Sequence, residues 1–326
     1  MSRQGRFLRS LALLCVLLVT ASLSAACSGV KTKTGPAGDG QSLKILATTS
    51  IVADVVQQAG GDVFSVETLL PTGVDPHEFN PAPQDLAKVA DADLIFANGA
   101  GLETFLDPLL QSAGGSAKVV KVSDGVQLLN LREESQGTGT PAGPAVTENV
   151  QGYDPHVWTD PNNVITWTDN IAKALAELDP GHKDTYDRNA AQYKQKLQEL
   201  DAWIRDQVAQ VPEANRKIVT DHLVFGYFAK EYGFQQIGAI VPAFSTMAEP
   251  PPQDLAKLED QIRALNVKAV FVGNTANPNL AQRVAEDTGA KLVYLYTGSL
   301  SPPGGEAGTY IDFMHYDVNA IVSALK

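Results

Sequence analysis

A single pattern of short strands and helices occurs twice along this chain. Short apolar or β-branched runs cover residues 43–48, 63–70, 94–98 and 118–122, and again 217–220, 235–241, 267–272 and 291–296. Helix-like segments lie between or after them, near 51–59, 84–90, 103–112, 224–231, 253–265, 277–287 and 309–325. Strands that alternate with helices form mainly parallel sheets with helices on both faces. The repeat therefore predicts an α/β protein with two domains of about four strands each.

A long helix is predicted between the two series. From Tyr186 to Val208, apolar residues recur at intervals of three or four, which is the spacing of one helix face. The helical segment that carries this stripe, from about residue 183 to 210, covers some 27 residues, or roughly 40 Å. We expect a linking helix over 181–211, between an N-terminal lobe over 43–180 and a C-terminal lobe over 212–326. The alternative is a surface helix that belongs to one domain alone.

The first 26 residues have the order of a secretory signal peptide. Three arginines precede an apolar run over 11–20, which is too short to span a bilayer, and small residues follow the run. Cys27 lies where a bacterial lipoprotein signal places the cysteine that receives the lipid, although an ordinary cleavable signal is the alternative. Residues 27–42 are predicted as a flexible tether. We expect an extracytoplasmic protein that is anchored to the cell membrane through Cys27.

The composition restricts the chemistry that this chain can use. Its formal net charge of −12 disfavours sequence-independent binding to nucleic acid phosphates. Two cysteines, one of them within the signal peptide, cannot form a disulfide scaffold or a thiolate zinc cluster. A bound transition metal would therefore depend on carboxylates and on the five histidines. The segment 131–151, which is predicted as a polar loop, contains none of these histidines.

Three of the histidines lie where a binding site is expected. His77 and His156 each stand in the pattern Asp-Pro-His, followed by one residue and then an aromatic residue. The aspartate two positions earlier, Asp75 or Asp154, is expected to accept the second ring N–H of its histidine. His222 ends the first strand of the second series, and open parallel sheets bind ligands beyond the carboxyl ends of their strands.

The ordinary alternative is that each of these histidines is a hydrogen-bonded loop residue. Their separations along the chain carry no motif information, unlike two histidines on one helix face. The remaining two histidines are not assigned to the site. His182 lies in the solvated first turn of the long helix, and His315 lies beside the apolar stripe of the last helix.

Longer phrases around these histidines resemble one protein family. They are Leu-Pro-Thr-Gly-Val-Asp-Pro-His-Glu-Phe-Asn-Pro, Asp-Pro-His-Val-Trp-Thr-Asp-Pro and Thr-Asp-His-Leu-Val-Phe-Gly-Tyr-Phe-Ala-Lys-Glu-Tyr-Gly. All are similar to the cluster A-I substrate-binding lipoproteins of bacterial zinc and manganese ABC importers. The resemblance implies two Rossmann-like α/β domains with four-stranded parallel sheets, joined by a long rigid backbone helix. It also implies that His77, His156 and His222 ligate a metal between the domains, and that the chain is not an enzyme but delivers this metal to an ABC permease and its ATPase.

The sequence departs from the family where a fourth ligand is usual. The family commonly has Asp in a Thr-Asp-Ser phrase, but this chain has Gly298 there, and Gly273 replaces a second acid that often follows an earlier strand. Glu306 on the following loop is a candidate fourth ligand. Three imidazoles without either carboxylate suit Zn²⁺ better than Mn²⁺. We therefore expect a monomeric receptor for zinc, with manganese or iron as the alternative cargo.

Two other classes of function have less support in the sequence. A hydrolase with zinc held by three histidines would activate water at the open fourth position, but no additional general acid or base accompanies these histidines. A surface adhesin is the other class, and the chain shows no repeats of an adhesive kind, no aromatic-rich patch and no basic stripe.

Overall fold

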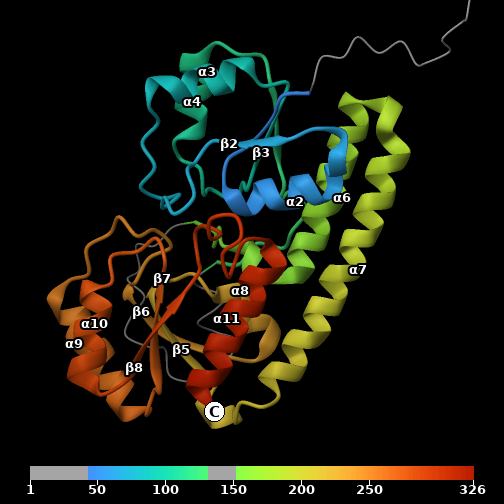
Figure 1. Cartoon of the computed structure of the whole chain (residues 1–326). Coiled ribbons are helices and arrows are strands. Elements are labelled where there is room, and N and C mark those ends of the chain that lie inside the picture. The colour runs from blue at the N-terminus through green and yellow to red at the C-terminus, as the bar shows by residue number, and fades with distance from the viewer. Residues whose placement is uncertain (1–42, 131–151) are drawn as a thin grey trace, which may run out of the picture. The chain divides into compact units, whose positions relative to one another are not determined.

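The computed structural model describes residues 43–130 and 152–326, which form two α/β lobes (Figure 1). The predicted signal peptide, Cys27, the tether and the loop over 131–151 lie outside the described residues. The N-terminal lobe contains β1 (Ile45–Ala47), α2 (Ser50–Gly60), β2 (Val66–Thr68), α3 (Pro83–Asp91), β3 (Leu94–Ala97), α4 (Leu106–Ala113), β4 (Lys118–Lys121) and α6 (Pro161–Leu178). After α7 (Lys183–Val208), the C-terminal lobe contains β5 (Lys217–His222), α8 (Gly226–Tyr232), β6 (Gln235–Val241), α9 (Pro252–Ala264), β7 (Ala269–Gly273), α10 (Asn279–Thr288), β8 (Lys291–Leu295) and α11 (Tyr310–Leu325).

Each lobe contains a parallel sheet of four strands, and the two sheets have the same topology. The strand orders are β2-β1-β3-β4 and β6-β5-β7-β8, and every pair of neighbours is parallel. The repeat and the α/β fold class predicted from the sequence are confirmed. In both sheets the order reverses beside the first strand of the series, β1 or β5. The carboxyl ends of strands at such a reversal are where open α/β sheets bind ligands.

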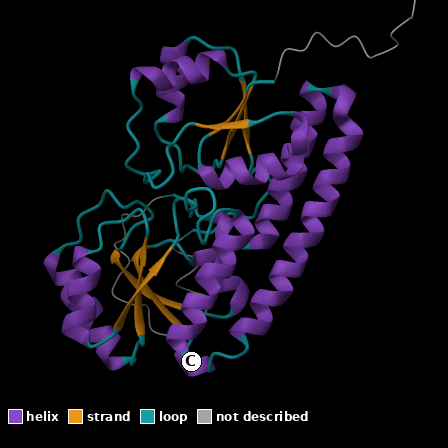
Figure 2. Cartoon of the chain, viewed as in Figure 1, coloured by secondary structure: helices purple, strands orange, loops and turns teal. Residues whose placement is uncertain are grey.

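Helices cover both faces of each sheet (Figure 2). Successive residues of a strand point to opposite faces, so neighbouring buried residues contact different helices. In β1, Ile45 and Ala47 belong to the apolar cluster that contains helix α2. Leu46 between them belongs to a second cluster, with Val89 of α3 and Leu109 of α4. This burial on two sides explains why the short strands read as continuous apolar runs.

Helix α7 carries the apolar stripe that its sequence predicts. The buried residues of α7 are Tyr186, Ala190, Tyr193, Leu197, Leu200, Ile204 and Val208. The helix packs against α2 and α6 of the N-terminal lobe and against α11 of the C-terminal lobe (Figure 1). All of the buried residues of α7 except Ala190 belong to one apolar cluster that also includes Phe96 of β3 and Phe271 of β7. The core is therefore continuous from one lobe to the other.

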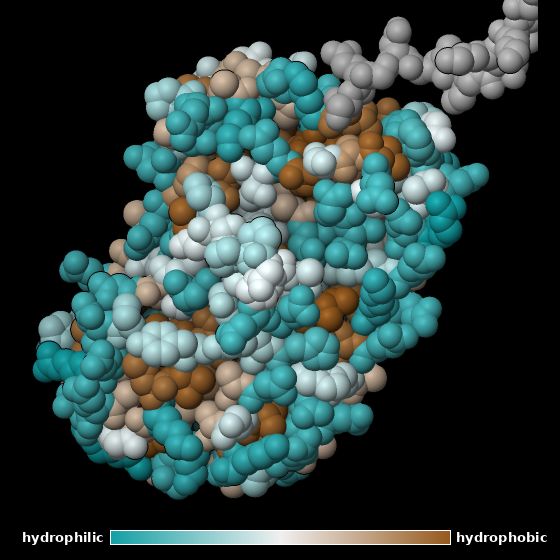
Figure 3. Space-filling view, in the orientation of Figure 1, coloured by the Kyte–Doolittle hydropathy of each residue, from teal (hydrophilic) through white to brown (hydrophobic). Residues whose placement is uncertain are grey.

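The surface is mostly polar where it is visible. On the face shown in Figure 3, hydrophilic residues predominate and hydrophobic residues show as separate patches. Among the described residues, no helix combines the length and the apolar character needed to cross a bilayer.

Candidate metal centre

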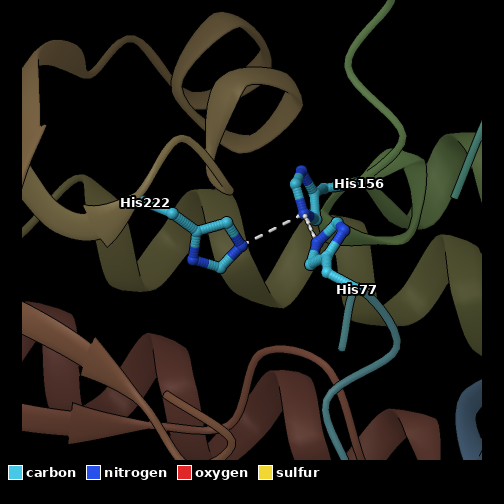
Figure 4. A group of neighbouring side chains, drawn as sticks. All are labelled: His77, His156 and His222. Carbon is cyan, nitrogen blue, oxygen red and sulfur yellow. Dashed lines mark hydrogen bonds between the residues drawn. The ribbon is translucent and has the colours of Figure 1, made fainter. Parts of the chain in front are cut away.

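Three histidines from distant parts of the chain meet at one point (Figure 4). His77 lies in the loop between β2 and α3, His156 precedes the short helix Val157–Thr159, and His222 is the last residue of β5. The Nε2 atom of His156 lies 3.1 Å from Nε2 of His77 and 3.2 Å from Nε2 of His222. Ligand atoms about 2.0–2.1 Å from one tetrahedral ion are roughly 3.3 Å apart. The group therefore has the dimensions of a site for a single metal ion.

A carboxylate lies behind each of the two buried histidines. Oδ1 of Asp154 is 2.7 Å from Nδ1 of His156 and also accepts the backbone N–H of that residue at 2.9 Å. Oδ1 of Asp221 is 2.9 Å from Nδ1 of His222 and accepts its backbone N–H at 2.7 Å. Because a carboxylate accepts hydrogen bonds, Nδ1 of each ring carries the hydrogen. Nε2 of each ring is then left with its lone pair directed at the centre.

These carboxylates leave the Nε2 atoms of His156 and His222 available to ligate a cation. The Nε2 atoms of His156 and His222 face each other over 3.2 Å. A proton does not fill the gap readily, because burial and the neighbouring rings hold the pKa of His156 well below its usual range. Burial is the main cause that lowers the pKa of His77 to about 3. Both rings therefore stay in the neutral form that ligates metal.

The sequence patterns do not identify Asp221 as a partner of the His222 ring, although it directly precedes His222. Burial alone would raise the pKa of this carboxyl, but the His222 ring and the N–H groups of His222 and Gly273 hold the pKa below its usual value. The Gly273 N–H donates to Oδ2 at 2.9 Å. The sequence signal for this pair is an acid that directly precedes a histidine at the end of a strand, because the strand holds both residues at one edge of the sheet.

The described residues match one protein family over almost their whole length. The family is ZnuA, the zinc-uptake complex component A periplasmic, and the match covers residues 45–324. The chain belongs to this family. This confirms the resemblance found in the sequence.

Relatives in and around the ZnuA family differ in the metal for which they are named. The manganese-binding lipoprotein MntA of Halalkalibacterium halodurans is 35% identical over 95% of this chain and 97% of its own length. The manganese ABC transporter substrate-binding lipoprotein PsaA of Streptococcus pneumoniae is 32% identical over 98% and 99%. The solved structure of the periplasmic zinc binding protein TroA from Treponema pallidum has a TM-score of 0.77 at 26% identity, and covers 88% of this chain and 99% of TroA. These are binding and transport proteins, which confirms the prediction that this ZnuA-family chain is not an enzyme.

Asp75 does not hold the His77 ring, contrary to our expectation from the shared Asp-Pro-His pattern. Oδ1 of Asp75 accepts the backbone N–H of His77 at 2.8 Å, and Oδ2 accepts the hydroxyl of Thr246 at 2.8 Å. Both oxygens are therefore engaged away from the imidazole. The Thr246 bond joins the loop after β6 in the C-terminal lobe to the loop that carries His77.

The structure leaves little room for a side chain at Gly298 and Gly273, the two positions where the family resemblance leads us to expect an acid. A Cβ atom at Gly298 would lie 2.8 Å from Cδ of Pro76, and one at Gly273 would lie 2.0 Å from Oγ1 of Thr297. An acid at either position requires the neighbouring loop to move. Glu306, the candidate from the sequence, is exposed on the loop before α11 and does not join the histidine group in the described part of the chain.

The two remaining histidines lie away from the group, as expected. His182 ends a short helix at the surface, where its Nδ1 is 2.6 Å from Oδ2 of Asp179. The ring of His315 packs edge-on against Trp203, with their centroids 4.1 Å apart. Each ring is accounted for by its local contact.

Proposed function

We propose that this chain is the substrate-binding component of an ABC importer for a divalent transition metal, and that its cargo is zinc held by His77, His156 and His222. One observation carries the proposal. Two Nε2 lone pairs converge across 3.2 Å because Asp154 and Asp221 accept from the opposite nitrogen of each ring. This is the arrangement by which ligating histidines are oriented toward a metal.

The choice of zinc rests on the ligand types. Among the described residues the group contains three imidazoles and no carboxylate. Imidazole suits zinc, whereas manganese prefers oxygen ligands. Manganese is the second candidate, because MntA and PsaA are both named for it.

The mechanism we propose is capture and release, with no chemical step. His77 and His156 come from the N-terminal side of α7 and His222 from the C-terminal side, so a bound ion joins the two lobes. His156 and His222 are only 1% and 3% exposed, whereas His77 is partly exposed. We infer that the ion enters and leaves past His77. The carboxylates of Asp154 and Asp221 offset the positive charge that the ion brings into a buried site.

The setting we propose is the outer side of a cell membrane, where Cys27 carries the lipid and a permease with its ATPase receives the ion. The placement of PsaA among ABC transporter lipoproteins supports this setting. Mass spectrometry of the membrane fraction tests the anchor. A mature chain that begins with a diacylated Cys27 is expected, and a soluble chain without lipid would contradict it.

Metal content and competition test the function. We expect protein purified without chelator to contain about one equivalent of zinc per chain, as measured by elemental analysis. After removal of the metal, calorimetric titration is expected to show one site that prefers zinc to manganese. One site that prefers manganese would keep the receptor function and overturn the choice of zinc. No saturable site for either ion would overturn the function itself.

A further inference from the structure

We propose that residues 297–299, in the loop between β8 and α11, position all three histidines although none of the three residues is a ligand. The proposal rests on the function proposed above. Three sets of contacts lead from this segment, which we call the 297–299 loop, to the supports of the three histidines.

The first set reaches the loop that carries His77. The backbone N–H of Gly73 donates to Oγ of Ser299 at 2.8 Å. Pro76, the residue before His77, packs so closely on Gly298 that an added Cβ would lie 2.8 Å from its Cδ. The missing side chain at Gly298 therefore sets how near the His77 loop comes to the C-terminal lobe.

The second set reaches His156 through Trp158. The indole Nε1–H of Trp158 donates to the carbonyl oxygen of Thr297 at 3.0 Å. The Trp158 ring packs edge-on against His156, with their centroids 5.3 Å apart, and Trp158 is 2% exposed. A buried indole that is bonded at its nitrogen cannot move without moving the imidazole beside it.

The third set reaches His222 through the end of β7. The side chain of Asn274 accepts the N–H of Thr297 at 3.1 Å and donates to the carbonyl of Ser299 at 3.3 Å. The adjacent Gly273 donates its N–H to Asp221, the acid that holds His222. A Cβ at Gly273 would lie 2.0 Å from Oγ1 of Thr297, so these two segments are also in close contact.

These contacts couple the position of the 297–299 loop to the geometry of the three histidines. The three histidines come from three different segments, but one chain of contacts from each of them leads to the same loop. A small shift of the 297–299 loop therefore changes the separations between the Nε2 atoms without removing any ligand. Hydrogen-bonding partners behind metal ligands are typically worth 10- to 100-fold in affinity.

Gly298→Ala tests this positioning role, with Gly308→Ala as its matched control. A Cβ at Gly308 meets nothing closer than 3.5 Å, which is ordinary contact. We expect Gly298→Ala to weaken zinc binding about tenfold and Gly308→Ala to leave the affinity unchanged. The visible absorption spectrum of bound Co²⁺ should change in Gly298→Ala, because the ligand geometry changes. Equal zinc affinity and an unchanged Co²⁺ spectrum in Gly298→Ala and the wild type would overturn the proposal.

A second substitution separates positioning from general damage to the fold. Pro76→Ala removes the Cγ and Cδ atoms, which include the nearest atom that a Cβ at position 298 would meet, and leaves the contact with Oγ1 of Thr275 at 3.0 Å. The double variant Gly298→Ala with Pro76→Ala should therefore recover part of the lost affinity. A double variant as weak as Gly298→Ala alone would contradict the role of this contact.

If Gly298→Ala does not fold, Ser299→Ala replaces it. This variant adds no volume and removes the bond from Gly73, together with the hydroxyl contacts of Ser299 to Ser50 and to the Leu300 carbonyl. It should weaken zinc binding several-fold.

The wild type provides the reference for both proposals. If wild-type protein binds no zinc or manganese, the proposed function fails, and the positioning role fails with it. If the wild type binds zinc and neither Gly298→Ala nor Ser299→Ala weakens binding, only the positioning role is wrong.

Discussion

At the scale of single residues, the hydrogen-bond partner of each histidine decides what a substitution should do. His156 and His222 are buried with an aspartate on Nδ1, whereas His315 packs on Trp203 outside the group. The same residue type therefore has two different roles in one chain, and a matched pair of variants can separate them.

His222→Ala is expected to lower zinc affinity by two or more orders of magnitude, because it removes one of three ligands and leaves Asp221 buried without its ring partner. His315→Ala should change the affinity by less than about twofold, since it removes only an aromatic contact. Competition with a chromogenic chelator measures both values. Similar losses in the two variants would show that zinc binds elsewhere.

Substitutions of Asp154 and Asp75 are also expected to differ in their effect on zinc affinity. Asp154→Asn should weaken zinc binding by about 10- to 100-fold, because the neutral amide polarises the His156 ring less than a carboxylate does. Asp75→Asn should weaken zinc binding at most a few-fold, since Asp75 accepts from the backbone N–H of His77 and from the hydroxyl of Thr246 and not from an imidazole. Isothermal titration of both variants at one pH compares them. A larger loss in Asp75→Asn would reverse the roles that the hydrogen bonds indicate.

The sequence patterns predict the three histidines but not all of the residues that surround them. Asp154 was predicted as a ring partner from the Asp-Pro-His pattern, and the structure places it there. The same pattern failed for Asp75, because the Thr246 hydroxyl that engages it comes from the other lobe. The contact between Gly298 and Pro76 depends on how closely two distant loops approach, and no local pattern encodes that distance.

At the scale of elements, helix α6 is capped at its N-terminus by a buried carboxyl group that can carry a charge. Asp160 is the N-cap of α6 and accepts the N–H of Asn162 at 2.9 Å. Burial, with Glu231 and Asp201 nearby, raises the pKa of Asp160 from 3.8 to about 6. A raised carboxyl pKa means that the folded state favours the protonated form. This contribution to stability is present below the unfolded pKa of 3.8 and is lost as the pH rises through 6.

Asp160→Asn should therefore stabilise the protein at pH about 7.5, on the order of 1 kcal/mol, and have little effect near pH about 3, below the unfolded pKa. Asparagine keeps the capping oxygen and removes the charge. Urea unfolding at the two pH values measures the difference. Destabilisation at the higher pH would show that the helix N-terminus favours the ionised carboxylate more strongly than burial disfavours it.

Most elements could be predicted because they are strongly patterned. The apolar runs located all eight described strands, and the stripe from Tyr186 to Val208 located α7. No predicted range delimited α6, whose sequence mixes buried Trp167 and Thr168 with polar residues. Its burial comes from packing between α2 and α7, which a local pattern does not show. Strand ends were also uncertain, since β1 extends only from Ile45 to Ala47.

At the scale of the whole molecule, the continuous core predicts how the protein unfolds. One apolar cluster includes β3, β7, α7 and α11, so the lobes share buried surface along the length of α7. Domains with separate cores can unfold separately, but residues that share one core lose their packing together. The group of three histidines lies between the same two lobes. We therefore expect one cooperative transition for the described part of the chain, both with and without metal.

Leu197→Ala tests this expectation at the centre of α7. Leu197 is 0% exposed within the shared cluster, and truncating a buried leucine typically costs about 2–5 kcal/mol. The substitution leaves a cavity in the core that both lobes share. The midpoint of urea unfolding should therefore fall equally for the amides of β3 and of β7. Hydrogen exchange read at Phe96 and Phe271 follows the two sheets separately. If one strand lost protection at a lower urea concentration than the other, each lobe would be an independent folding unit and α7 only a connection between them.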